Sequence, residues 1–178
     1  KNFQLNKLSF SVYCSAAIIY MMRRQRDASG LSLFSDKVDF HVEPRLSSVH
    51  LDLLYSQLSD LLKPDKAALK RGTNAVEVLH QIADNIHKRS MVVIFSDMIN
   101  AANPDEIYQA LQHLRYNKHE VILFHVTDKK HEEELVYSNR PHRFVDLETG
   151  EVIKLKPQEV RREYARVMHE MVNDLKLK

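Results

Sequence analysis

The sequence predicts an α/β protein whose doubly wound, mostly parallel sheet has helices on both faces and one antiparallel hairpin at its edge. The first observation is the segment Ser90–Asp97, in which five apolar residues run without a break before Ser96 and Asp97. Such a run is typical of a strand buried on both faces of a parallel sheet. A second apolar strand is expected at Glu120–Val126, and helical patterns precede and separate the two. This alternation of helices and strands builds parallel sheets.

The remaining elements follow from periodicity and turn residues. Residues 74–88 have apolar side chains at i, i+3 and i+4, which predicts an amphipathic helix. Asn103 and Pro104 provide a helix cap and a first helical residue, so another helix is expected to begin there. No linker or low-complexity stretch interrupts the pattern, so we expect a single domain over residues 1–178. The other expected helices are 5–26, 47–62 and one beginning near Pro157, and the other expected strands are 30–34, 38–42, 143–147 and 151–155.

Charge and composition exclude several classes of protein. The 26 basic and 24 acidic residues leave a formal net charge of +2, which provides no nucleic-acid footprint. The three glycines, Gly30, Gly72 and Gly150, are too far apart for a dinucleotide-binding G-x-G-x-x-G motif or a P-loop. The single cysteine, Cys14, can form neither an internal disulfide nor a C-x-x-C zinc motif.

The sequence also lacks the usual signals for a membrane or for secretion. The longest apolar run, Ala16–Met22, is shorter than the roughly 20 residues that a helix needs to span a bilayer. No small-residue cleavage site of a signal peptide follows it. We therefore expect no membrane segment in this chain and a cytoplasmic, reducing location.

Two residues are candidates for binding a divalent cation. Thr73 lies in the loop ahead of the helix expected at 74–88, and Asp97 ends the first buried strand. Open α/β sheets bind ligands at the carboxyl ends of their strands, and hydroxyl and carboxylate oxygens suit a hard cation such as Mg²⁺. The alternative is structural. Thr73 would then be a loop residue beside the helix cap Asn74, and Asp97 would accept hydrogen bonds from backbone amides of the next turn.

The histidines provide a weaker candidate. The chain has ten, but none are in the H-E-x-x-H spacing of zinc proteases. His80 and His87 are seven residues apart, or about two helical turns, so they could face one ligand together. Since two histidines do not make a zinc site, we expect a solvated helix edge instead.

Four segments, in chain order, resemble a known family. The chain resembles the von Willebrand factor A-like domain of the DUF58 proteins, which bacteria commonly encode beside MoxR-type AAA+ ATPases. The last segment contains the D-x-E-T-G-E pattern that is characteristic of a hairpin in that family. The resemblance extends over nearly the whole chain. The matching segments are Gln25–Phe34, Gly72–Ala75, Val92–Asp97 and Phe144–Glu151.

The resemblance implies a Rossmann-like, doubly wound fold with a metal-ion-dependent adhesion site above the sheet. In the family, one aspartate and two serines come from a D-x-S-x-S motif after the first strand, and a threonine and a second aspartate complete the set. Thr73 and Asp97 match these last two positions. No D-x-S-x-S occurs in the sequence, and the family places it just before the first helix. We therefore expect the domain to be incomplete at its N-terminus, with the remaining ligands absent from this chain.

The function that this resemblance implies is a non-enzymatic protein-interaction module. A Mg²⁺ ion held incompletely by the protein would accept a carboxylate from the partner as its remaining ligand. The implied partner is a MoxR-type AAA+ ATPase or one of its clients, in chaperone-like assembly of other complexes. Two alternatives stay open: a metal-dependent hydrolase with Asp97 as ligand or nucleophile, and a degenerate domain with a purely structural role.

Overall fold

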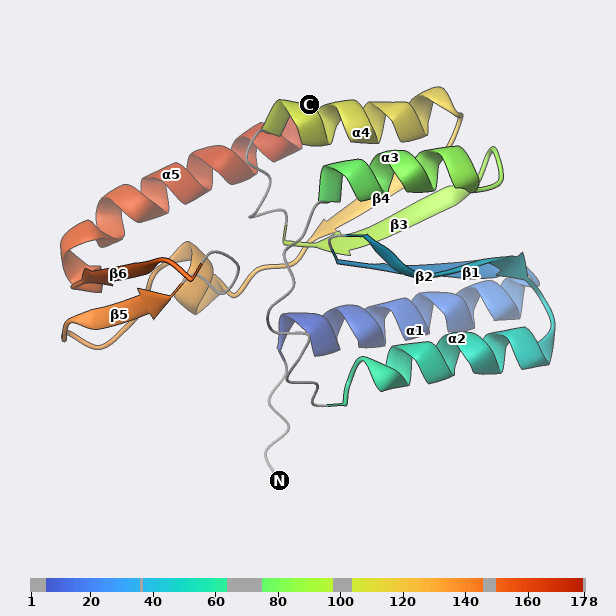
Figure 1. Ribbon diagram of the computed structural model, residues 1–178, viewed down its shortest axis with the longest axis horizontal. Helices are drawn as coiled ribbons and strands as arrows, with labels where there is room; N and C mark the ends of the chain where they lie inside the picture. Colours follow the sequence, from blue (N-terminus) through green and yellow to red (C-terminus); the bar gives the residue numbers. More distant parts are fainter. Residues whose placement is uncertain (1–5, 36, 64–74, 98–103, 146–149, 178) are drawn as a thin grey trace. The chain divides into compact units, whose positions relative to one another are not determined.

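The computed structural model describes residues 6–35, 37–63, 75–97, 104–145 and 150–177 (Figure 1). Contacts divide the chain into two compact units, Lys1–Val126 and Thr127–Lys178. The single domain over residues 1–178 stays a prediction.

The first unit consists of the helices and strands that the sequence pattern predicts, with ends shifted by a few residues. Helix α1 begins with a capping box, in which the side chain of Asn6 accepts a hydrogen bond from the amide of Ser9 and the Ser9 hydroxyl accepts one from Asn6. In chain order the elements are α1 (Lys7–Gln25), β1 (Ser29–Phe34), β2 (Val38–Arg45), α2 (Ser48–Asp60), α3 (Ala75–Asn85), β3 (Met91–Ser96), α4 (Pro104–Tyr116) and β4 (Glu120–His125).

The strands of this unit form two separate pairs in the described part of the chain. Strands β1 and β2 are an antiparallel hairpin, as predicted. Strands β3 and β4 are parallel and in register, from Met91 opposite Glu120 to Ser96 opposite His125. An α/β protein with a parallel pair and an antiparallel hairpin is thus confirmed. The described residues do not join the two pairs into one doubly wound sheet.

Helices cover the strands of this unit from two sides. Figure 1 shows α3 and α4 on one side of the strands and α1 and α2 on the other. Each helix pair packs into its own core because its apolar stripe faces the strands. The α3–α4 core contains Leu79, Ala83, Ile94, Ile107, Ala110 and Leu114, and the α1–α2 core contains Val12, Ile19, Leu51, Leu54 and Leu58.

The two parallel strands are less buried than the sequence predicts. Only Ile94 of β3 is fully buried. Burial alternates along β4, so that Ile122 and Phe124 are exposed. The reason is that the α3–α4 core packs against β3 and β4, whereas the α1–α2 core packs against β1 and β2. Burial on both faces of a strand requires packing from both sides.

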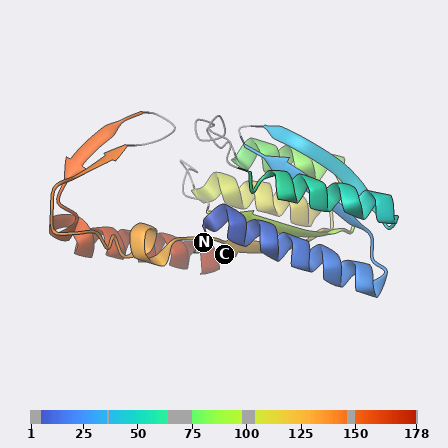
Figure 2. The ribbon, with the colours of Figure 1, turned by 90° about the horizontal axis from the view of Figure 1, so that it is seen from below.

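The second unit joins a helical turn, a hairpin and the last helix. The π-helical turn η2 (Lys129–Glu133) lies beside α5 (Pro157–Leu177), as Figure 2 shows, and the hydroxyl of Tyr164 donates a hydrogen bond to the carbonyl of Glu132 at 2.7 Å. Strands β5 (His142–Val145) and β6 (Val152–Leu155) form the predicted antiparallel hairpin.

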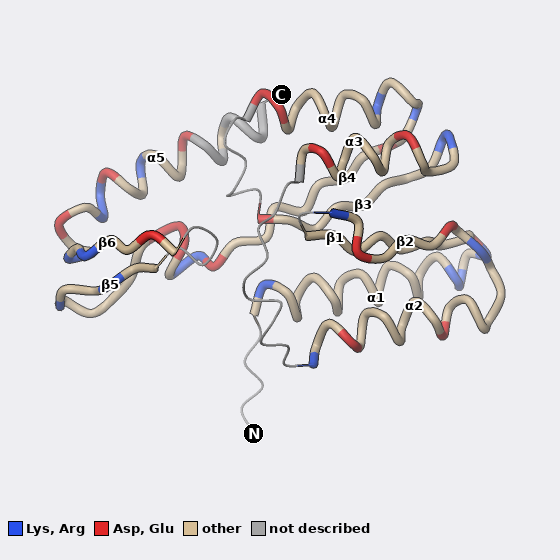
Figure 3. Tube along the Cα trace, in the orientation of Figure 1, with Lys and Arg blue, Asp and Glu red and all other residues tan. Residues whose placement is uncertain are grey.

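Basic and acidic residues are interspersed along the described part of α5 (Figure 3). Arg166 illustrates this pattern, since it bonds Glu163 and Glu170 one turn away on either side. None of the helices in the described ranges has the length and apolar character needed to cross a bilayer.

The core of the first unit provides a stability test within a single helix. Leu114 of α4 is 0% exposed, whereas Tyr116 of the same helix is 85% exposed. We expect Leu114→Ala to lower the free energy of unfolding by about 2–5 kcal/mol, because it leaves a cavity in the α3–α4 core. Tyr116→Ser should change it by about 0.5 kcal/mol or less. Urea unfolding followed by circular dichroism measures both, and equal effects would contradict the packing described.

Candidate functional site at the carboxyl end of β3

Asp97 lies where the parallel strand pair ends. It directly follows β3, whose last residue Ser96 pairs with His125, the last residue of β4. Both strands therefore end at the same edge of the sheet, which is where α/β proteins bind ligands. The side chain of Asp97 is 39% exposed, so it is accessible to a ligand.

Two residues distant in the sequence hold Asp97 in place. The ammonium of Lys7 donates a hydrogen bond to Oδ2 of Asp97, with 2.8 Å between the nitrogen and the oxygen. The ring nitrogen Nε2 of His125 donates to the backbone carbonyl of Asp97 at 2.7 Å. The ion pair neutralises the carboxylate, and the histidine fixes the main chain below it.

Lys7 occupies an unusual place in its helix. It is the first residue of α1, and no acidic residue is present in the first turn. The N-terminus of a helix has a partial positive charge, so a lysine there is unfavourable by itself. The carboxylate of Asp97 provides the negative charge that the local sequence lacks.

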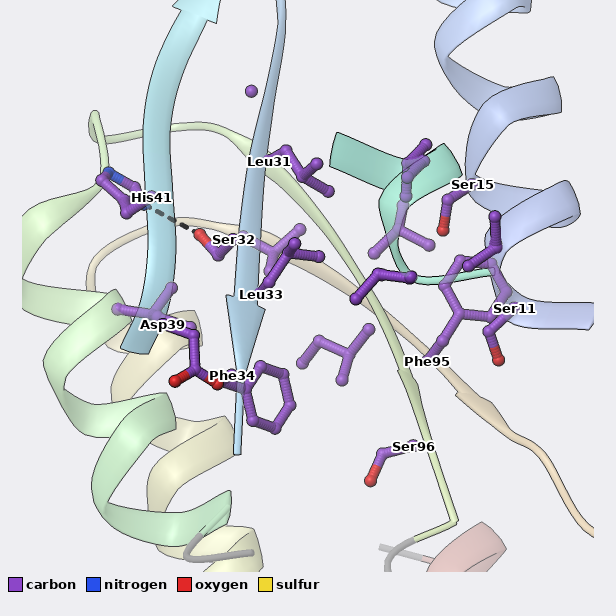
Figure 4. A pocket seen from close by; sticks show the side chains of 18 of the residues that line it. Ser11, Ser15, Leu31, Ser32, Leu33, Phe34, Asp39, His41, Phe95 and Ser96 are labelled. Atoms are coloured by element: carbon purple, nitrogen blue, oxygen red, sulfur yellow. Dashed lines mark hydrogen bonds between the residues drawn. The ribbon is translucent and has the colours of Figure 1, made fainter. Parts of the chain in front are cut away.

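A cleft of about 660 Å³ extends from this ion pair between β1 and β3. Figure 4 shows Leu31, Leu33 and Phe34 of β1 along one side, and Phe95 and Ser96 of β3 along the other. The two strands run in the same direction in this view. Apolar side chains from α1, from α3 and from Ile86 just after α3 also line the cleft, together with the polar Lys7, Ser11 and Ser15 of α1. The apolar residues are Leu8, Val12, Leu79, Ile82 and Ile86.

The second predicted ligand cannot be placed beside Asp97. Thr73 lies outside the described residues, so its role stays a prediction. In the described part of the chain, no group of three or more histidine, cysteine, aspartate or glutamate side chains is arranged to hold a metal ion. Since Oδ2 of Asp97 also bonds Lys7, the described residues by themselves do not fit a divalent cation.

The structure brings His80 to a partner that the sequence pattern did not indicate. Its Nδ1 lies 3.0 Å from Nδ1 of His113, which joins α3 to α4. Nε2 of His113 lies 3.2 Å from Asp84, whose side chain is mostly exposed. The expected solvated edge is therefore wrong for His80, because helix packing turns it towards α4. His87 instead bonds the carbonyl of Lys88 at 3.0 Å.

A second group of polar side chains lies in the other unit and has a structural explanation. Asp128 caps η2, and its Oδ2 accepts a hydrogen bond from Nδ1 of His131 at 2.7 Å. That hydrogen bond is the main reason why the pKa of the Asp128 carboxyl is lowered. Burial raises the pKa of Tyr164, whose hydroxyl bonds η2. Asp128 thus stabilises the turn itself, and Tyr164 holds the turn against α5.

These features define an α/β protein with a partly exposed carboxylate above the end of a parallel strand pair. The sequence model of the family described as "Protein of unknown function DUF58" matches residues 2–173. The chain therefore belongs to the DUF58 family, as the four motifs predicted. Comparison with curated proteins and with solved structures found no match.

Proposed function

We propose that this chain is a non-enzymatic protein-interaction module that docks a partner at the carboxyl end of β3. The observation that carries the proposal is Asp97, a partly exposed carboxylate whose charged neighbour is a lysine. A hydrolase built on Asp97 would need a second carboxylate within a few ångströms. Among the described residues, the interactions of the Asp97 side chain include no such carboxylate. A charged side chain that is partly exposed suits recognition of a partner better than it suits enclosed chemistry.

The proposal includes a doubly wound sheet of the von Willebrand factor A type. The cleft separates β1, which pairs with β2, from β3, which pairs with β4, and the described residues provide no strand for the edges that face it. A strand of about six residues, the length of β1 and β3, would join the pairs into one sheet. Apolar side chains from α1 and α3 would cover both of its faces.

The position of α1 supports a strand that precedes it in the polypeptide. Lys7 and Leu8, at the start of α1, line the cleft near Asp97 and so near the carboxyl end of β3. A strand parallel to β3 would end there, and a short loop would connect it to α1. This is the strand-to-helix connection of parallel sheets. We propose that this strand carries the D-x-S-x-S motif expected ahead of residue 1.

The partner and the metal in this proposal come from the resemblance. A MoxR-type AAA+ ATPase or one of its clients, in the cytoplasm, is the partner that we propose. Assistance by Mg²⁺ would require Thr73 and the D-x-S-x-S side chains in addition to Asp97, because one carboxylate cannot fill the coordination shell. The docking proposal itself depends on Asp97.

Asp97→Ala tests docking. We expect binding to a purified MoxR-type ATPase, measured by calorimetry, to weaken by about tenfold or more, as for loss of an anchoring charge in an interface. The matched control is Asp60→Ala, which removes another carboxylate that bonds a lysine, Lys63, at 2.6 Å. This control should leave binding unchanged.

The fold of Asp97→Ala should stay intact, because an ion pair exposed to this extent contributes roughly 0–1 kcal/mol. Circular dichroism and thermal unfolding check this point. Unchanged binding by a folded Asp97→Ala protein would favour a purely structural scaffold over docking.

Hydrogen exchange tests the completed sheet. In a polypeptide that carries the proposed strand ahead of residue 1, the β1 and β3 amides that point into the cleft should exchange as slowly as those that face β2 and β4. In the 178-residue chain these amides should exchange faster. A hydrogen-bonded amide exchanges only when its hydrogen bond opens, which is rare, whereas an unpaired amide exchanges without such an opening. Fast exchange at these amides in the longer polypeptide would count against a strand in the cleft.

A further inference from the structure

Exposed basic side chains gather where β3 and β4 begin, at the opposite end of the strands from Asp97. The turn after α3 contains Lys88 and Arg89, and α4 has Arg115 in its last turn and Lys118 just after its end. Figure 3 shows lysine and arginine where these two helices end. All four side chains are exposed, and none forms an ion pair with a residue in the described ranges. Their charges are therefore accessible to a partner.

Three hydrogen bonds hold the two turns side by side. The amide of Glu120 donates to the carbonyl of Ser90 at 3.0 Å. The amide of Ser90 donates to Nδ1 of His119 at 3.2 Å, and His119 is buried. The side-chain amide of Asn117 donates to the carbonyl of Ala83 at 3.0 Å. Because neighbouring strands lie about 4.8 Å apart, one ligand can contact the cations of both turns.

Neutralisation of the helix ends accounts for only part of this positive charge. The C-terminus of a helix has about half a negative charge, and its effect falls off within the last turn. The last turn of α3 contains no basic residue, and Lys88 and Arg89 lie beyond it. Glu120, at the start of β4, adds one negative charge. After the two helix ends and this carboxylate are offset, about two positive charges remain.

The backbone at two of these positions favours glycine over a residue with a side chain. Arg89 and Lys118 both have a φ of 64°, in the left-handed region. The Cβ of a side chain is crowded in that conformation, so glycine is the usual residue just after a helix. Strained residues of this kind cluster at functional sites. The two cations thus lower stability at positions where glycine would not, which is expected if their charges have a function.

We propose that an acidic segment of a protein partner docks on these turns, whose exposed residues we call the basic surface: Lys88, Arg89, Arg115, Tyr116 and Lys118. The ring of Tyr116 is 85% exposed beside Arg115, and tyrosine and arginine are enriched among the residues that dominate protein interfaces. A single-stranded nucleic acid instead favours a basic groove that follows several nucleotides, with aromatic rings for successive bases. The basic surface is confined to two turns, and the length of the strands separates it from the site at Asp97.

Titration with fluorescein-labelled hexaglutamate, followed by fluorescence anisotropy, tests the basic surface in the 178-residue chain. We expect Arg89→Gly/Lys118→Gly to bind about tenfold more weakly than the wild-type chain, because half of the cations are lost. The same variant should unfold at a temperature about 2–4 °C higher, because glycine relieves the strained backbone. Binding by the wild-type chain should also weaken as the salt concentration rises.

Two further variants separate charge from backbone conformation. Lys88→Gln/Arg115→Gln removes the other two cations and changes no left-handed residue, so we expect a similar loss of binding. Arg26→Gly is the matched control, because Arg26 has a φ of 63° at the end of α1, which covers the other side of the strands (Figure 1). This control should raise the unfolding temperature and leave hexaglutamate binding unchanged. Circular dichroism checks that each variant is folded.

Four results would overturn the inference. The first is no measurable binding of hexaglutamate by the wild-type chain at low salt, or equal binding by the double glycine variant. The second is an equal loss in Arg26→Gly, because overall charge would then explain the binding. The third is a lower unfolding temperature of the double glycine variant, which would show that the cations stabilise their helix ends. The fourth is tighter binding of hexathymidylate than of hexaglutamate, which would indicate a nucleic-acid partner.

Discussion

The parallel pairing of β3 with β4 is the constraint on which the rest of the first unit depends. Its unbroken register from Met91 to Ser96 makes both strands end at one edge of the sheet. Asp97, the residue after β3, is therefore close enough for its carbonyl to bond His125. Two parallel strands alone would be unstable in water. The apolar stripes of α3 and α4 stabilise the two strands because they bury Ile94 of β3 beneath the helices. The position of the candidate site is therefore a consequence of how this core packs.

The helices, strands and hairpins could be predicted because their signals are local. Periodicity located α3 and α4, and turn residues located the hairpins. The contacts of the site could not be predicted in this way, since Lys7 lies 90 residues from Asp97 and the first turn of α1 has no acidic residue. His113 was missed for the same reason, because only the packing of α3 on α4 brings it to His80. The exposed side of β4 depends likewise on which helices cover the sheet.

Local and long-range preferences conflict at the ion pair, and they agree almost everywhere else in this unit. A lysine at the first position of a helix works against the helix dipole, and a carboxylate at a strand end has few partners of its own. The ion pair between Lys7 and Asp97 supplies a negative charge for the lysine and a partner for the carboxylate. Such conflicts are more often found at functional sites than in the scaffold. Asp97 is therefore a stronger functional candidate than His80 and His113, whose contact joins neighbouring helices.

The cleft between β1 and β3 also bears on solubility. Natural proteins protect strand edges with proline, lysine or other charged residues, because an open edge pairs readily with another chain. The segments SGLSLF of β1 and MVVIFS of β3 contain none of these. Their composition is that of interior strands, which have neighbours on both sides. A chain in which these edges face water is consequently prone to edge-to-edge aggregation, and any peptide that pairs with them would also act as a solubilising agent.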